Sequence, residues 1–204
     1  MKNKQASQHP VHSKNVVEFV TVAAEYCSFL ENSNQQDTRS FIEKMTKIIP
    51  LLYLKASLLP SFETMLEEEV IEQFVSEEEY EFIRQQIMNV IGQYDEYLEV
   101  FHPDMQYSDS PVLASISEDL ADVYQDLKDM IANFQSADLQ IMNEALANCK
   151  ENFRNFWGQK LINALRSLHN VLYSGADFED SEEDNESGFA FEFLEKNVED
   201  EFLE

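Results

Sequence analysis

Apolar side chains recur every three or four positions through most of this chain, which is the spacing of one face of an α-helix. The first such stretch covers residues 13–31, and Ser13 stands at the position of an N-cap. The second starts near residue 37 and meets Pro50, where the missing backbone donor should kink or restart the helix. The following run LLYLKASLLP (51–60) is apolar nearly all round, so it predicts the most buried helix of the domain.

The second half of the chain continues the same spacing. Residues 63–74 carry an acidic stretch with a short apolar face, which favours a short outer helix. Ser76 and Glu79 have the spacing of a capping box and open a helix that ends at Gly92. Residues 92–112 are the least regular segment. A further helix is predicted from Ser115 or Ser117 onwards.

The last predicted helix is the longest. Asp138 is a good cap for it, and its apolar stripe lasts until about Tyr173. No stretch alternates clearly enough to predict a strand, and no internal repeat is present. The pattern therefore predicts an all-α fold, an irregular helical bundle of about five or six helices with a disordered acidic C-terminal tail.

Three parts follow from this pattern: a flexible N-terminus (1–12), the bundle (13–173) and the acidic tail (174–204). The stretch DFEDSEEDNESG has no periodicity and predicts disorder on composition alone. The final FAFEFLEKNVEDEFLE alternates carboxylates with aromatic rings. It is too apolar for a spacer, and we interpret it as a docking segment whose contact residues are Phe189, Phe191, Phe193 and Phe202.

Charge changes the picture because it is unevenly spread. The net charge of −26 divides into +2 for residues 1–60, −17 for 61–137, +1 for 138–173 and −12 for 174–204. A chain this acidic repels nucleic-acid phosphates over most of its surface, so direct nucleic-acid binding is disfavoured. Acidic residues are thus concentrated in residues 61–137 and 174–204, whereas residues 1–60 and 138–173 are nearly neutral.

Several classes of protein lack support. No apolar run is long enough for a signal peptide or a membrane helix, which predicts a cytoplasmic protein with no membrane contact. The two cysteines each fall at apolar helix positions and are predicted to be buried. Nucleophile motifs, phosphate loops and paired-cysteine zinc spacings are absent. A single Glu-x-x-His, at Glu99, falls short of the two that a di-metal bundle needs, so we predict no catalytic motif, metal site or cofactor.

Two places could hold a ligand or a partner. The segment HPDMQYSD is the densest polar cluster outside the tail; a histidine with carboxylates suits a ligand site, or simply a hydrogen-bonded loop. The longest helix offers cations beside an indole, for an anionic ligand or for neutralising acidic neighbours. The candidates from the loop and the helix are His102, Asp104, Tyr107, Asp109, Arg154, Trp157 and Lys160.

Lys55 is the oddest residue of the predicted core, because it stands within the apolar run 51–60. A lysine there must either extend its amine outward or pair with a carboxylate. We include it among the candidate site residues.

Three stretches together resemble a known family: LLYLKASLLP (51–60), YLEVFHPDMQYSDSPV (97–112) and ENFRNFWGQKLINALRSLH (151–169). They resemble the bacterial family catalogued as domain of unknown function 5063, and the likeness covers roughly residues 10–173. The resemblance implies a helical bundle and brings no catalytic signature. The acidic tail lies outside it.

Three hypotheses of function follow. The leading one is a non-catalytic protein-binding or adaptor module with a protein partner that the acidic, aromatic tail contacts. The second is a small-ligand-binding protein or enzyme acting on a phosphorylated or carboxylated ligand, in a pocket between the loop and the long helix. The third is a nucleic-acid mimic, which requires rows of carboxylates across residues 61–137.

Overall fold

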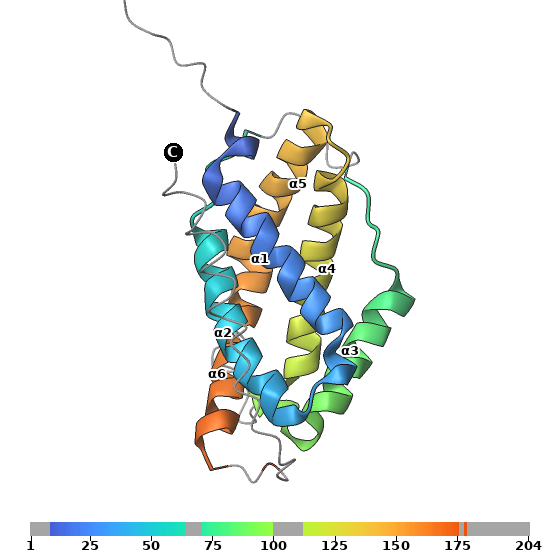
Figure 1. Cartoon of the computed structure of the whole chain (residues 1–204), viewed down its shortest axis with the longest axis vertical. Coiled ribbons are helices and arrows are strands. Elements are labelled where there is room, and N and C mark those ends of the chain that lie inside the picture. The colour runs from blue at the N-terminus through green and yellow to red at the C-terminus, as the bar shows by residue number, and fades with distance from the viewer. Residues whose placement is uncertain (1–8, 64–70, 100–111, 176–177, 179–204) are drawn as a thin grey trace, which may run out of the picture.

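The computed structural model of the chain describes residues 9–63, 71–99, 112–175 and 178 (Figure 1). Within these residues the prediction of an all-α bundle of about five or six helices is confirmed. No helix among them is both long and apolar enough to cross a membrane. The helices are α1 (Lys14–Glu31), α2 (Thr38–Ser57), α3 (Glu77–Ile91), α4 (Ile116–Phe134), α5 (Leu139–Asn152) and α6 (Gly158–Tyr173).

Side-chain caps explain why several helices begin where they do. Asp37 accepts a hydrogen bond from the backbone N–H of Ser40 and starts α2. Ser76 accepts one from Glu79 and starts α3, as the capping-box spacing predicts. Asp138 accepts two and starts α5. Each cap satisfies backbone donors that have no partner inside the helix, so these short polar sequences fix where the helices of the bundle begin.

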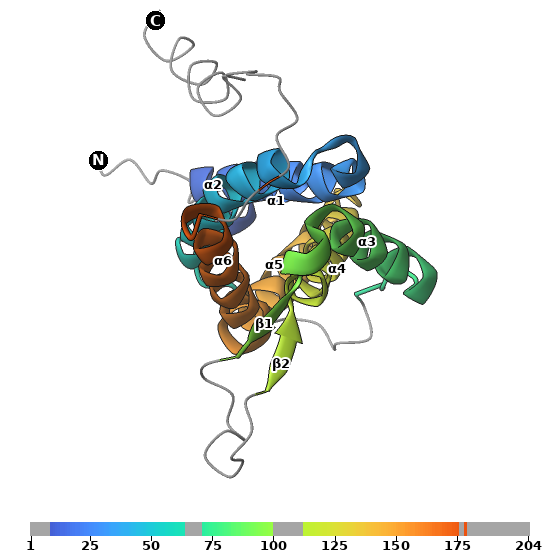
Figure 2. The same cartoon turned by 90° about the horizontal axis from the view of Figure 1, so that it is seen from below.

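Helix α4 lies at the centre of the bundle and packs against α1, α3, α5 and α6 (Figures 1 and 2). Its apolar stripe includes Leu120, Val123 and Leu127, which have no exposed surface. The hydroxyl of the buried Tyr26 on α1 donates to the Leu120 carbonyl at 2.9 Å. Helices α1 and α2 form an antiparallel pair, and α2 lies beside α6. The free cysteines Cys27 and Cys149 are both buried, as predicted.

The prediction for residues 51–60 was wrong. Residues 51–57 form the C-terminal part of α2, which continues through Pro50 rather than restarting there, and residues 58–60 follow the end of the helix. Leu54 is 51% exposed and Leu58 is 47% exposed, so the run does not form the most buried helix. Pro50 lies on the exposed side, where one lost backbone hydrogen bond is tolerated. Much of the apolar surface of this run faces outward instead of into the core.

Residues 139 to about 173 were predicted as one long helix, whereas the structure divides them into α5 and α6. A π-helical turn, η6 (Phe153–Trp157), joins α5 to α6. A Cβ added at Gly158 would stand 2.3 Å from the Phe153 carbonyl oxygen, five residues earlier. The wider turn brings that carbonyl close to residue 158, and only glycine leaves room for it. The turn directs Trp157 into the core.

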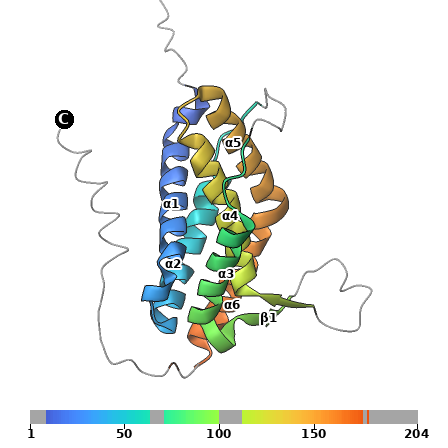
Figure 3. The same ribbon diagram turned by 90° about the vertical axis from the view of Figure 1, so that its right-hand side faces the viewer.

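A small hairpin stands at one end of the bundle, where no strand was predicted (Figures 2 and 3). Strands β1 (Glu96–Leu98) and β2 (Leu113–Ser115) are antiparallel and pair Glu96 with Ser115 and Leu98 with Leu113. Three residues are too few for alternation to be recognised in a sequence.

Two further segments differ from expectation. Residues 71–75 are not helical, and their backbone N–H groups at Phe74 and Val75 donate to Asp129 of α4. The rest of the predicted outer helix, 64–70, lies outside the described residues. At the N-terminus, η1 (Pro10–His12) buries Val11 completely, so the folded domain begins before residue 13.

Candidate functional site

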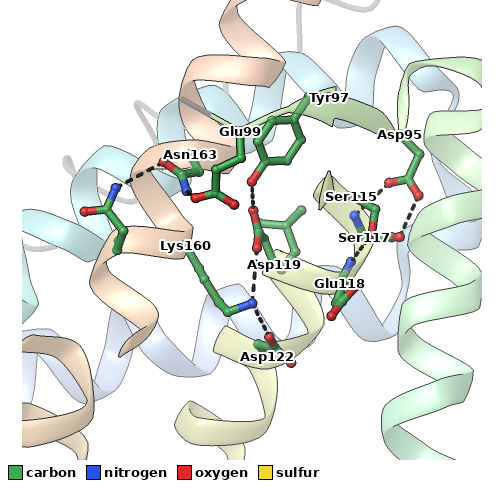
Figure 4. A network of polar contacts seen from close by, with 12 residues as sticks. Asp95, Tyr97, Glu99, Ser115, Ser117, Glu118, Asp119, Asp122, Lys160 and Asn163 are labelled. Atoms are coloured by element: carbon green, nitrogen blue, oxygen red, sulfur yellow. Dashed lines mark hydrogen bonds and ion pairs between the residues drawn. The ribbon is translucent and has the colours of Figure 1, made fainter. Parts of the chain in front are cut away.

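A polar network that joins four elements surrounds Lys160 of α6 (Figure 4). Its ammonium group donates to Asp122 at 2.6 Å and to Asp119 at 3.3 Å, both on α4. The hydroxyl of Tyr97, on β1, donates to the other oxygen of Asp119 at 2.5 Å. Tyr80 of α3 donates to Asp122 at 2.8 Å. Four elements therefore meet at two carboxylates and one ammonium group.

Burial sets the electrostatics of this network. It raises the pKa of Asp119 to about 6, although Tyr97 and Lys160 oppose that shift by bonding the carboxylate. Burial and the hydrogen bond to Asp119 also raise the pKa of Tyr97 well above its usual value, so the tyrosine stays the donor. Burial acts to lower the pKa of Lys160, but the two aspartates outweigh it and the pKa is raised. The donors and acceptors named above satisfy one another, which is the arrangement of a structural ion-pair cluster.

The hairpin next to this network carries the predicted HPD–YSD loop. Glu99, at the end of β1, accepts a hydrogen bond from Asn163 of α6 at 2.8 Å. At the other end of the hairpin, Asp95, which precedes β1, accepts hydrogen bonds from both the backbone N–H and the hydroxyl of Ser117 in α4. The hairpin is thus held against α6 near the loop and against α4 at its other end (Figure 4). The predicted residues themselves, His102, Asp104, Tyr107 and Asp109, lie outside the described residues.

A cleft, called the α4–α5 cleft below, lies between α4, α5 and the segments around residues 62 and 72. Its volume is about 880 Å³. Asp126 lines it, with its pKa raised to about 6 by burial and its carboxylate held by the Asn152 amide. Among the described residues, five carboxylates and two cations line the cleft: Glu72, Asp126, Asp129, Glu144, Glu151, Lys150 and Arg154. Within the described residues, no group of three or more His, Cys, Asp or Glu is arranged to hold a metal ion.

The predicted residues of the long helix do not converge on one pocket. Arg154 is exposed beside the α4–α5 cleft. Trp157, predicted as a site residue, is a core residue with no exposed surface, and its indole N–H donates to the Cys149 carbonyl at 3.2 Å. Lys160 turns to α4 and lies over the Phe156 ring instead. The π turn causes this divergence, because it shifts the register of side chains along the helix.

Lys55 follows one of its two predicted outcomes. Its amine donates to Glu18 of α1 at 2.6 Å, and the two side chains are 22% and 32% exposed. The pair links α1 to α2 near their ends, where Asn15 also donates to the Leu58 carbonyl. Lys55 therefore stabilises the α1–α2 pair.

The exposed surfaces of α2 and α6 share an unusual composition. The two helices lie side by side, and the Tyr53 and Phe153 rings are in contact at 5.0 Å between centroids. Helix α6 contains no acidic residue, and the one acid of α2, Glu43, pairs with Arg39. We define the α2–α6 face as the exposed residues Lys47, Pro50, Tyr53, Leu54, Ile162, Arg166, His169 and Tyr173.

The carboxylates of the acidic middle segment are largely used inside the bundle. Along α4, Asp119, Asp122, Asp126 and Asp129 each accept hydrogen bonds from another element. On α3, Glu81 pairs with Arg84. A nucleic-acid mimic needs free carboxylates in rows, and paired carboxylates at half-buried positions argue against it.

A model of the family described as "Domain of unknown function (DUF5063)" matches residues 10–174. The chain belongs to this family. The DUF5063 bundle resembles the crystal structure of protein BF1032 from Bacteroides fragilis, with a TM-score of 0.73 and 46% sequence identity. That similarity covers 81% of this chain and 96% of the other. None of the curated proteins compared with the chain matches it.

The DUF5063 match ends at residue 174, where the acidic tail begins, so the tail lies outside the matched region. Sequence reasoning missed the aspartates of α4, although a signal was present. They recur at 119, 122, 126 and 129, the same spacing as the apolar stripe beside them. Carboxylates that follow the period of a buried stripe indicate internal partners rather than a solvated face. The predicted docking residues Phe189, Phe191, Phe193 and Phe202 lie outside the described residues.

Proposed function

We propose that this DUF5063 protein is a non-catalytic protein-binding module and that the α2–α6 face is its binding surface. The observation that carries the proposal is the character of that face. Aromatic and aliphatic side chains are exposed on an acid-poor surface of a chain with net charge −26. Leu54 is 51%, Ile162 43% and Tyr173 71% exposed.

Two physical properties make such a face suited to a protein segment. Exposed apolar side chains supply affinity when they are buried in a complex, since each Leu or Ile contributes about 1.5–3 kcal/mol on full burial. Lys47 and Arg166 lie among them and supply favourable charge for a partner that is acidic as well as apolar. Aromatic residues and arginine are also the types enriched in interface cores.

The test compares two double variants of the full chain as bait. Leu54→Glu/Ile162→Glu places two carboxylates on the α2–α6 face. Val17→Glu/Phe82→Glu places two on α1 and α3, at positions that are 56% and 62% exposed. Affinity capture from bacterial lysate is quantified against wild type, after circular dichroism and thermal melts show that both variants fold.

We expect the captured amount of each partner protein to be at least about tenfold lower for the face variant than for wild type, which corresponds to about 1.4 kcal/mol of binding free energy. The same proteins should remain within about twofold for the variant on α1 and α3, since a twofold change is only about 0.4 kcal/mol. Equal capture by both variants would exclude the α2–α6 face as the binding surface.

The α4–α5 cleft supports a second candidate, the binding of a small ligand. Its volume suits a metabolite. Its five carboxylates and two cations favour a cationic ligand over the phosphorylated or carboxylated one expected from the sequence. Spermidine and inorganic phosphate can be compared by thermal shift on wild type and Asp126→Asn. Stabilisation of wild type by spermidine, weakened in the variant, would support this candidate; no shift would refute it.

A further inference from the structure

The α2–α6 face has a complementary sequence within the same chain. Residues 189–204 hold six carboxylates, one lysine and four phenylalanines. The α2–α6 face holds two exposed cations, Lys47 and Arg166, and no acidic residue; Lys55 and Lys160 of the same helices pair instead with Glu18 and with the α4 aspartates. The tail segment thus offers carboxylates and phenyl rings, whereas the α2–α6 face offers cations and apolar side chains. Opposite charge and matched apolar surface are the two requirements of a specific, salt-dependent contact.

The chain leaves the bundle at the right place for this contact. Helix α6 ends at Tyr173, and Gly175 takes a positive φ of +76° that turns the backbone. Phe178 then packs its ring on Tyr94, with 5.7 Å between centroids. Tyr94 shares a groove with Asn170 and Val171, so Phe178 anchors the chain beside the C-terminal end of α6.

The distance to be covered is short. Ten residues, 179–188, separate the Phe178 anchor from the aromatic segment. Ten extended residues span up to about 33 Å. The whole of α6, with 16 residues, is about 24 Å long at 1.5 Å per residue. Every position on the outer surface of α6 and on the neighbouring part of α2 is therefore within reach.

We propose that residues 189–204 dock on the α2–α6 face of the same molecule and compete there with partner proteins. This inference rests on the proposed function, because it takes that face as a binding surface. Tethering makes a weak contact sufficient. Short linkers give effective concentrations in the millimolar range, so a segment whose affinity as a separate peptide is only about 1 mM would occupy its site about half of the time.

The test uses the full chain with the photo-reactive amino acid benzoyl-phenylalanine at position 191. After irradiation, the monomer band is digested and cross-linked peptides are identified by mass spectrometry. We expect the adducts in α2 and α6. Their yield should fall at least about threefold from 0.1 to 1 M NaCl, since the Debye length falls from about 10 to about 3 Å. Leu54→Glu/Ile162→Glu should reduce the yield similarly, and Val17→Glu/Phe82→Glu should not.

Other outcomes overturn the inference. Adducts on α3 or α4, or none, would show that the segment does not dock on this face. A covalent dimer whose yield rises with protein concentration, with α2 and α6 adducts, would show that the face belongs to a second copy.

Comparing both experiments separates this inference from the proposed function. If the tail adducts are absent but the face variant still loses captured proteins, the inference fails and the function stands. If the tail docks and the face variant captures as wild type does, the proposed function and the competition both fail, and only the docking of the tail stands. Deleting residues 179–204 should raise capture about twofold when the tail competes, because a half-occupied face becomes free.

Discussion

Removing the ammonium group of Lys160 is the perturbation whose consequence the structure defines most closely. Lys160→Met keeps the apolar stem and its packing but leaves Asp119 and Asp122 without their cation. The three side chains are 23%, 7% and 16% exposed, which places the cluster between a surface and a buried ion pair. Surface pairs contribute about 0–1 kcal/mol, whereas breaking a buried pair costs about 3–5 kcal/mol. We therefore expect a loss of about 2–3 kcal/mol at pH 7.5.

The pH dependence of that loss is a stricter test. Asp119 has a folded-state pKa of about 6, above its value in the unfolded chain, so the folded state binds more protons at mildly acidic pH. Its protonation thus stabilises the fold as the pH falls from about 6 towards 4. Without Lys160 this pKa rises further, and one aspartate can be neutral at pH 5.5. The cost of Lys160→Met should fall by at least half there.

Urea unfolding followed by circular dichroism at pH 7.5 and 5.5 measures both quantities. Lys47→Met is the matched control, because Lys47 is exposed on α2, and it should change the unfolding free energy by less than about 0.5 kcal/mol. Two results would refute the assignment of this network as a stabilising ion-pair cluster. One is a loss of unfolding free energy for Lys160→Met no larger than that of the control at pH 7.5. The other is a larger loss at pH 5.5 than at pH 7.5.

Three further substitutions test other parts of the fold by the same unfolding measurement. Gly158→Ala should lower the unfolding free energy by about 2–3 kcal/mol, because the new Cβ would stand 2.3 Å from the Phe153 carbonyl oxygen. The control Gln159→Ala should change it by less than about 0.5 kcal/mol, and equal effects of the two substitutions would contradict the π turn. Asp126→Asn should raise the unfolding free energy by about 1–2 kcal/mol at pH 7.5, and this gain should shrink towards pH 5 because wild-type Asp126, with a pKa of about 6, becomes protonated. A lower unfolding free energy of the variant at pH 7.5 would contradict the burial of the Asp126 charge. Tyr26→Phe should cost about 1–1.5 kcal/mol through the lost bond to Leu120, with the exposed Tyr53→Phe as a near-neutral control; matching losses would contradict the Tyr26 bond.

Much of the bundle was predictable because local signals and tertiary packing agree. Ser76 and Asp138 are caps in the sequence and in the structure, and the apolar stripes of α1, α4 and α6 are the faces buried in the core. Such segments can be predicted from sequence because their local preferences agree with the packing of the whole fold.

The remainder depended on partners that a sequence does not contain. The run 51–60 was wrongly placed in the core because apolar composition does not say whether a neighbouring element covers it. Trp157 lies in the core, and not beside Arg154 as expected, because a π turn changes which side chains share a face. The role of Lys160 needed the positions of Asp119 and Tyr97, on two other elements.

The claim that the α2–α6 face binds other proteins can be tested most directly by cross-linking inside cells. Benzoyl-phenylalanine is placed at Ile162 in one chain and at Phe82 of α3 in another, both ending at Phe178 so that the tail cannot react. The account predicts discrete adducts with other proteins at position 162 and none of them at position 82. The same adduct pattern at both positions, or adducts at position 82 alone, would contradict it.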